Sequence, residues 1–151
     1  MDLTAQSPVF IVEDLLIARH LSTHPEHAAA RQVWAHLTAI RPPLVTIPAV
    51  LDAAATTLAR TSSPLFAADR ARRWAASRAL TVIEPTADDH QAALAWLERY
   101  RDPQANLADC WAWAVMARLR ITEAGTFRDP YRWAGFALLP QRLHIRRQNT
   151  P

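Results

Sequence analysis

Short apolar runs that alternate with longer helical segments restrict the folds open to this chain of 151 residues. The first run, Pro8-Val-Phe-Ile-Val12, consists mostly of β-branched and aromatic residues, the pattern of a strand buried on both faces. Comparable runs follow at Leu44-Val-Thr46, at Thr81-Val-Ile-Glu84 and between Ile121 and Thr126. Strands separated by helices need crossover connections, so the sequence predicts an α/β protein: a three-layer α/β/α sandwich with a central, mostly parallel sheet.

The segments between these runs carry helix start signals. Thr23 or His24 is expected to cap one helix. Ser63, which is followed by a proline, is expected to cap a helix from Leu65 to Leu80. The stretch Thr86-Ala-Asp-Asp89 is a capping box in carboxylate form and opens the next helix.

The last third of the chain predicts a helix from Asn106 to Arg118, the strand that ends at Thr126, a sharp turn and a last strand before Pro140. Asp109 is the only carboxylate on this helix. Asn106 is placed to cap the helix, with Asp109 at capping-box spacing. Capping alone would therefore explain why this acid is present.

Length and composition favour a single domain over residues 1–151. With 50% hydrophobic residues, a chain of this size buries one sizeable core. The core is expected over about residues 8–140. The tail, residues 141–151, is expected to be disordered or to add a final strand around Leu143 and Ile145.

The chain shows no signal peptide and no apolar window of membrane-spanning length, so we expect a cytoplasmic protein without membrane contact. Cys110 is the single cysteine, which excludes an intrachain disulfide and a Cys-rich metal site. All seventeen basic residues are Arg, and the net charge is +3. Guanidinium groups suit phosphate, although codon usage in a GC-rich genome is the simpler explanation.

Several features of the last third occur together: Asp109 near the start of a helix, Thr126 at the end of the next strand, the pair Gly135-Phe136 and the closing Pro140. This arrangement resembles the C-terminal half of the PIN-domain ribonucleases, particularly the small toxins called VapC. The resemblance implies a PIN-like fold and a magnesium-dependent endoribonuclease that cuts structured RNA. It also implies a small antitoxin as partner, and a homodimer.

In PIN nucleases, acids at four places near the ends of strands hold the metal ion. By this resemblance Val12, Ala53 and Arg128 occupy three of the four positions, and Asp109 alone keeps the acid. A guanidinium supplies only hydrogen-bond donors and carries the charge of a cation, so Arg128 opposes metal binding. We therefore expect a degenerate active site without a bound cofactor.

Acids beside the lost positions offer an alternative. Glu13 and Asp14 lie beside the first position, Asp52 beside the second and Asp129 beside the fourth. Asp14, Asp52 and Asp129 are the displaced candidates that, with Asp109, would rebuild a site for Mg²⁺ or Mn²⁺. Successive side chains on a helix diverge by roughly 100°, so a neighbour replaces a ligand only if the backbone moves.

Arg128 leads to a sharper hypothesis. We expect its guanidinium to lie where the metal would be and to pair with Asp109, so that a protein cation replaces the ion. Together with Thr126 and Asn106, Arg128 would then bind a phosphate or a partner's carboxylate.

Two classes of function remain open. One is an active endoribonuclease toxin that uses the displaced acids. The other, which the missing acids favour, is a non-catalytic PIN module that binds RNA or an antitoxin-like protein. A toxin that decays after mutation is not distinguished from the second class by sequence. Of the six Trp residues, Trp113 and Trp133 are the candidates for exposure, and Trp34, Trp96 and Trp111 are expected in the core or at an interface.

Overall fold

The computed structural model describes residues 6–100 and 104–139, which form five strands and seven helices. The strands are β1 (Val9–Ile11), β2 (Leu44–Thr46), β3 (Leu80–Val82), β4 (Glu123–Gly125) and β5 (Ala137–Leu138). The helices are α1 (Glu13–His20), α2 (His27–Ile40), α3 (Pro48–Thr61), α4 (Pro64–Ala76), α5 (Ala87–Arg99), α6 (Leu107–Arg118) and α7 (Asp129–Trp133). Among these residues, no helix has both the length and the apolar character that crossing a bilayer requires.

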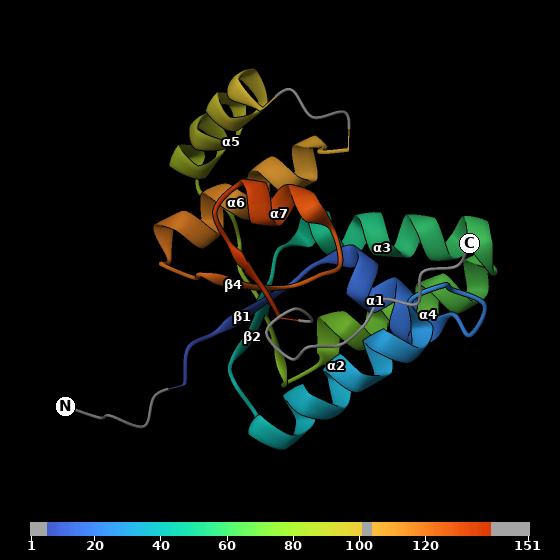
Figure 1. Ribbon diagram of the computed structural model, residues 1–151. Helices are drawn as coiled ribbons and strands as arrows, with labels where there is room; N and C mark the ends of the chain where they lie inside the picture. The colour runs from blue at the N-terminus through green and yellow to red at the C-terminus, as the bar shows by residue number, and fades with distance from the viewer. Residues whose placement is uncertain (1–5, 101–103, 140–151) are drawn as a thin grey trace.

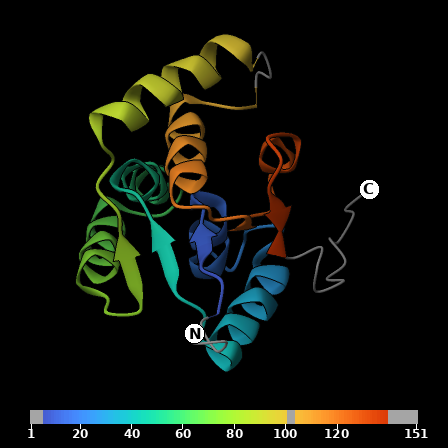
Figure 2. The ribbon, with the colours of Figure 1, turned by 90° about the vertical axis from the view of Figure 1, so that its left-hand side faces the viewer.

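The five strands of the described residues join one sheet in the order β3-β2-β1-β4-β5, and every pairing is parallel. Figure 2 shows them side by side in this order, from β3 at one edge to β5 at the other. The central strand β1 pairs with β2, where Val9 faces Leu44, and with β4, where Ile11 faces Gly125. The predicted α/β fold with a parallel central sheet is confirmed.

Alternate residues of β1 enter two separate apolar cores, as the period of a strand requires. Val9 and Ile11 pack with residues of α1, α2, α3 and α4, whereas Phe10 and Val12 pack with residues of α5, α6 and α7. Figure 1 shows α5, α6 and α7 on one side of the strands and α1, α2 and α4 on the other. This double coverage explains why the first strand is apolar at every position.

The capping signals locate several helix starts correctly. Ser63 Oγ accepts a hydrogen bond from the backbone N of Phe66 at 3.1 Å. Thr86 and Asp89 form the reciprocal capping box that their spacing predicted. These caps are local interactions of the chain with itself, so they are visible in the sequence.

Two helix boundaries differ from the sequence predictions. Neither Thr23 nor His24 caps α2, because His24 Nδ1 accepts a hydrogen bond from the backbone N of Glu26 at 3.1 Å within the preceding turn. α4 ends before Leu80, because the Ser77 hydroxyl accepts a hydrogen bond at 3.2 Å from the backbone two residues later. Leu80 instead begins β3.

The turn after β4 contains a short helix that the sequence analysis did not predict. Pro130, in the first turn of α7, has a fixed φ and lacks a backbone N–H, which suits a helix start. Gly135 adopts a φ of 102°, which favours glycine, and leads the chain toward β5. The strand predicted around Leu143 and Ile145 lies outside the described residues.

Trp113 and Trp133 differ in burial. Trp113 is fully buried (0% exposed) and contacts Trp96, Tyr100 and Tyr131 edge to face, with ring centres 5.2, 4.8 and 5.8 Å away. The prediction that Trp113 is a candidate for exposure is therefore wrong, because this side chain joins α5, α6 and α7. Trp133 is 55% exposed, as expected.

These two tryptophans form a matched pair for a stability test. We expect Trp113→Ala to lower the free energy of unfolding by about 3–5 kcal/mol, because it leaves a large cavity among three aromatic rings. Trp133→Ala should change it by less than about 1 kcal/mol. Urea unfolding followed by circular dichroism measures both values, and a similar cost for the two variants would contradict the burial described here.

Candidate functional site: an arginine among carboxylates

The candidate site forms where β1 and β4 end side by side. Val12, directly after β1, is the N-cap of α1, so Glu13 and Asp14 lie in the first turn of that helix. β4 ends at Gly125, in register with the end of β1, and the chain continues through residues 126–128 into α7. Because parallel strands end at the same edge of a sheet, these two segments meet.

Gly125 allows α1 to approach the end of β4 closely. A Cβ at this position would lie 2.9 Å from Leu15 Cδ2 and 3.2 Å from Ile11 Cδ1, inside the normal contact distance of carbon atoms. The backbone N of Val12 also donates to the Gly125 carbonyl at 3.2 Å. The first turn of α1 is therefore held against the segment that follows β4.

Asp14 uses both of its oxygens to hold that segment. Thr126 Oγ1 donates to Asp14 Oδ1 at 2.7 Å, and the backbone N of Phe127 donates to Asp14 Oδ2 at 2.8 Å. The Thr126 hydroxyl in turn accepts from the backbone N of Arg128 at 3.1 Å. Burial raises the pKa of Asp14, while its two hydrogen bonds act in the opposite direction. Asp14 thus positions the backbone from which the Arg128 side chain extends.

The guanidinium of Arg128 lies between Asp109 and Glu13. Its Nη2 donates to Asp109 Oδ2 at 2.8 Å and its Nη1 donates to Asp109 Oδ1, which makes a two-pronged contact. Nη1 also donates to Glu13 Oε1 at 3.0 Å, and Nη2 to the backbone carbonyl of Gln104. The predicted pairing of Arg128 with Asp109 is confirmed. Four acceptors thus match the four hydrogens on the two Nη atoms.

Asp109 combines this ion pair with a helix cap. Its carboxylate is fully buried, and Oδ2 also accepts from the backbone N of Asn106 at 2.9 Å. Asn106 Oδ1 accepts in return from the backbone N of Asp109 at 3.0 Å. The predicted capping box is therefore present at the start of α6. A carboxylate at this depth needs a cation, which Arg128 supplies.

Burial dominates the electrostatics of the cluster. Glu13 is 9% exposed, and its pKa is raised to about 7, first by burial and then by the charge of Asp109. Burial acts to lower the pKa of Arg128, but the hydrogen bonds and charge of Asp109 outweigh it, so the pKa is raised and the group stays charged. Burial also raises the pKa of Tyr131, whose hydroxyl feels Asp109 and Glu13. Within the described residues, Glu13 Oε2 and Tyr131 Oη have no hydrogen-bond partner.

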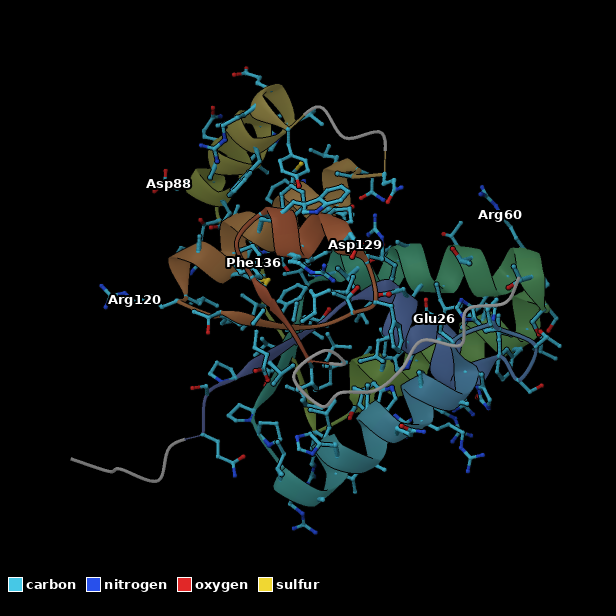
Figure 3. The ribbon with its side chains drawn as sticks, viewed as in Figure 1. Glu26, Arg60, Asp88, Arg120, Asp129 and Phe136 are labelled. Atoms are coloured by element: carbon cyan, nitrogen blue, oxygen red, sulfur yellow. The ribbon has the colours of Figure 1, made fainter. Side chains whose placement is uncertain are left out.

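The other candidate residues take no part in the hydrogen bonds of this cluster. Asp52 is exposed on α3, next to Ala53. Asp129, labelled in Figure 3, pairs with Arg132 of α7 at 3.1 Å. Val12 is buried in the apolar core. In the part of the chain that the structure describes, no group of three or more His, Cys, Asp or Glu side chains is arranged to hold a metal ion.

Sequence reasoning did not connect Glu13, Gln104 or Tyr131 with Arg128. Glu13 carried a usable signal, because an acid directly after a strand buried on both faces needs a positive partner. Gln104 carried none, since it contributes a backbone carbonyl that every residue possesses. Tyr131 lies in α7, the helix that the sequence analysis did not predict.

The structure is an α/β protein with a parallel sheet and a cluster of acids around one arginine near the ends of its central strands. The family model described as PIN domain matches residues 15–129, so the chain belongs to the PIN-domain family. It is similar to the crystal structure of VapC20 from Mycobacterium tuberculosis, a toxin that cleaves the sarcin-ricin loop. The TM-score is 0.77 and the identity 28%, over 85% of this chain and 96% of that one. The resemblance to VapC-type ribonucleases is thus confirmed; no curated protein matches by sequence.

The raised pKa of Glu13 predicts a pH-dependent stability. The folded protein keeps a proton on Glu13 up to about pH 7, whereas the ordinary value is 4.5, so the folded state binds more protons between these values. Stability should therefore fall as the pH rises through this window. Between about pH 5 and about pH 7.5, the wild type should lose on the order of 2–3 kcal/mol more than Glu13→Gln.

Urea unfolding of both proteins at the two pH values measures this difference. Gln keeps an oxygen that accepts from Arg128, so the variant isolates the titration from the hydrogen bond. Glu98→Gln, which changes an exposed acid of α5, should retain the full pH dependence of the wild type. Equal pH dependence in the wild type and Glu13→Gln would refute the prediction.

Proposed function

We propose that this chain is a catalytically inactive VapC-type PIN protein, in which Arg128 takes the place of a metal ion and which acts by binding a partner. The observation that supports this proposal is the two-pronged contact of Arg128 with Asp109, with Glu13 on the same guanidinium. The acid that the family uses for metal binding is thereby engaged by a cation of the chain itself.

A divalent cation would compete with Arg128 for the same oxygens. Both Asp109 oxygens accept from the guanidinium, and both Asp14 oxygens accept from the segment after β4. Mg²⁺ requires several hard oxygen ligands in near-octahedral geometry and would lie beside a fixed positive charge. Hydrolysis of a phosphodiester by this class depends on a metal that polarises the phosphate and activates water. The cluster therefore carries out no hydrolytic step.

The same contacts make Arg128 a poor phosphate ligand. Its Nη hydrogens face protein oxygens, and the acids around it repel an anion. Thr126 and Asn106, the other predicted binding residues, likewise use their side-chain oxygens inside the protein. We therefore place recognition outside this cluster and propose a protein partner of the antitoxin kind, which VapC-type toxins have in general. A homodimer, a single domain and a cytoplasmic location remain predictions.

Replacing Arg128 tests this proposal. We expect the wild type to show no saturable heat with Mn²⁺ or Mg²⁺, and Arg128→Asp to bind Mn²⁺, because a third acid then joins Glu13 and Asp109. At a hundredfold excess over Kd, binding should raise the melting temperature of this variant by about 5–10 °C. Arg132→Asp, on the exposed face of α7, is the control and should not respond to metal.

An RNA cleavage assay in the same buffers completes the test. The wild type should leave structured RNA intact at every Mn²⁺ concentration, and chelation should not alter its stability. Saturable metal binding by the wild type that disappears in Asp109→Asn, together with RNA cleavage, would show instead that displaced acids have rebuilt an active site.

A further inference from the structure

A pocket lies where strands β2 and β3 begin, at the opposite end of the strands from the acid cluster. Its volume is about 680 Å³, within the range of small-molecule sites. The end of α1, the second half of α2, the loop into β2 and the segment between α4 and β3 form its walls. The strands β2 and β3 begin here, at Leu44 and Leu80, whereas the acid cluster lies where strands end. The two sites are therefore separate.

Three arginines line this pocket, and the described lining residues include no acid. Arg19, Arg41 and Arg78 are exposed, and none of them forms an ion pair within residues 6–100 and 104–139. Arg118 and Arg128, in contrast, each contact a buried carboxylate. Among the described residues, no carboxylate therefore compensates the positive charge of the pocket.

Arg19 lies against the ring of Trp34. Its guanidinium carbon lies 4.3 Å from the centre of the Trp34 ring. A guanidinium that stacks on an aromatic face keeps its N–H donors in its own plane, available to a two-pronged acceptor. The surroundings are electropositive as well: burial and the charges of Arg19 and Arg70 lower the pKa of His20 to about 4.

The rest of the lining suits a group much larger than a single anion. Apolar surface comes from Trp34, Leu37 and Pro43, and hydroxyl groups come from Thr38, Ser77 and Thr81. A base has flat apolar faces and a hydrogen-bonding edge, and a ribose has hydroxyls. Both kinds of surface are therefore matched by the pocket.

We propose that this pocket binds the phosphate monoester of a nucleotide, with the phosphate at Arg19, Arg41 and Arg78 and the nucleoside against the wall that contains Trp34. A phosphate monoester carries about −1.5 to −2 charges and three acceptor oxygens, which match several guanidinium groups better than the single charge of a carboxylate does. The source is either a free nucleotide or the 5′ end of an RNA. This site is independent of the function proposed above.

Calorimetric titration with 5′-AMP at low salt tests the site. We expect one saturable site in the wild type, and a Kd raised about tenfold by each of Arg41→Gln and Arg78→Gln, because each removes a charged donor. Both residues are exposed, so the fold should be unaffected, as circular dichroism would verify. Arg60→Gln is the matched control, since Arg60 points outward at the far end of α3 (Figure 3).

Further probes separate the sources of the ligand. Adenosine, which lacks the phosphate, should not bind. A 5′-phosphorylated tetraribonucleotide that binds more tightly than 5′-AMP, and more tightly than its unphosphorylated form, would identify an RNA end; equal affinity would identify a free nucleotide. The proposal is overturned if 5′-AMP gives no heat at millimolar concentration, if Arg41→Gln and Arg78→Gln bind it as the wild type does, or if an acidic peptide displaces it more strongly than inorganic phosphate does.

Discussion

The contact between the Arg128 guanidinium and two buried acidic side chains, Asp109 and Glu13, is the interaction on which the carboxyl ends of the central strands depend. Asp109 has no exposure to water and lies at the first turn of α6, the helix that carries the central aromatic residue Trp113. Removal of the positive partner from such a pair typically costs about 3–5 kcal/mol, because the remaining charge stays buried. One side chain, that of Arg128, thereby connects α1, α6 and the segment after β4.

A guanidinium and a metal ion satisfy acids in different ways. A bound ion brings its own waters, exchanges with solvent and leaves open positions where a substrate binds. Arg128 brings no water, is tethered to the backbone by a segment that Asp14 holds in place, and directs its Nη donors at protein oxygens. The cluster is consequently well suited to hold secondary-structure elements together and poorly suited to polarise a phosphate.

The parts of this structure that the sequence predicted are those decided by local interactions. Strand β1 is buried on both faces because its residues are apolar at every position, and the cap of Asn106 with Asp109 depends on a spacing within one helical turn. The burial of Trp113 depends on the rings of Trp96, Tyr100 and Tyr131, which lie outside α6, so no pattern within this helix reveals it. The pairing of Arg128 with Asp109 was predictable because this fold brings the start of α6 to the carboxyl ends of the strands. The contact of Glu13 with the same guanidinium depends on how closely α1 approaches Gly125, which only the packed structure specifies.

The ion pair between Arg128 and Asp109 restricts which substitutions position 128 tolerates. Under the genetic code, Arg and Asp codons differ by more than one nucleotide, and the residues between them, such as Gly or His, lack a permanent guanidinium fork. Each such intermediate would leave Asp109 buried without its cation, in a chain whose stability margin is narrow. A change of Arg128 to an acid would therefore pass through an intermediate of lower stability. Because its replacement would lower stability, Arg128 is easier to retain than to exchange for another residue.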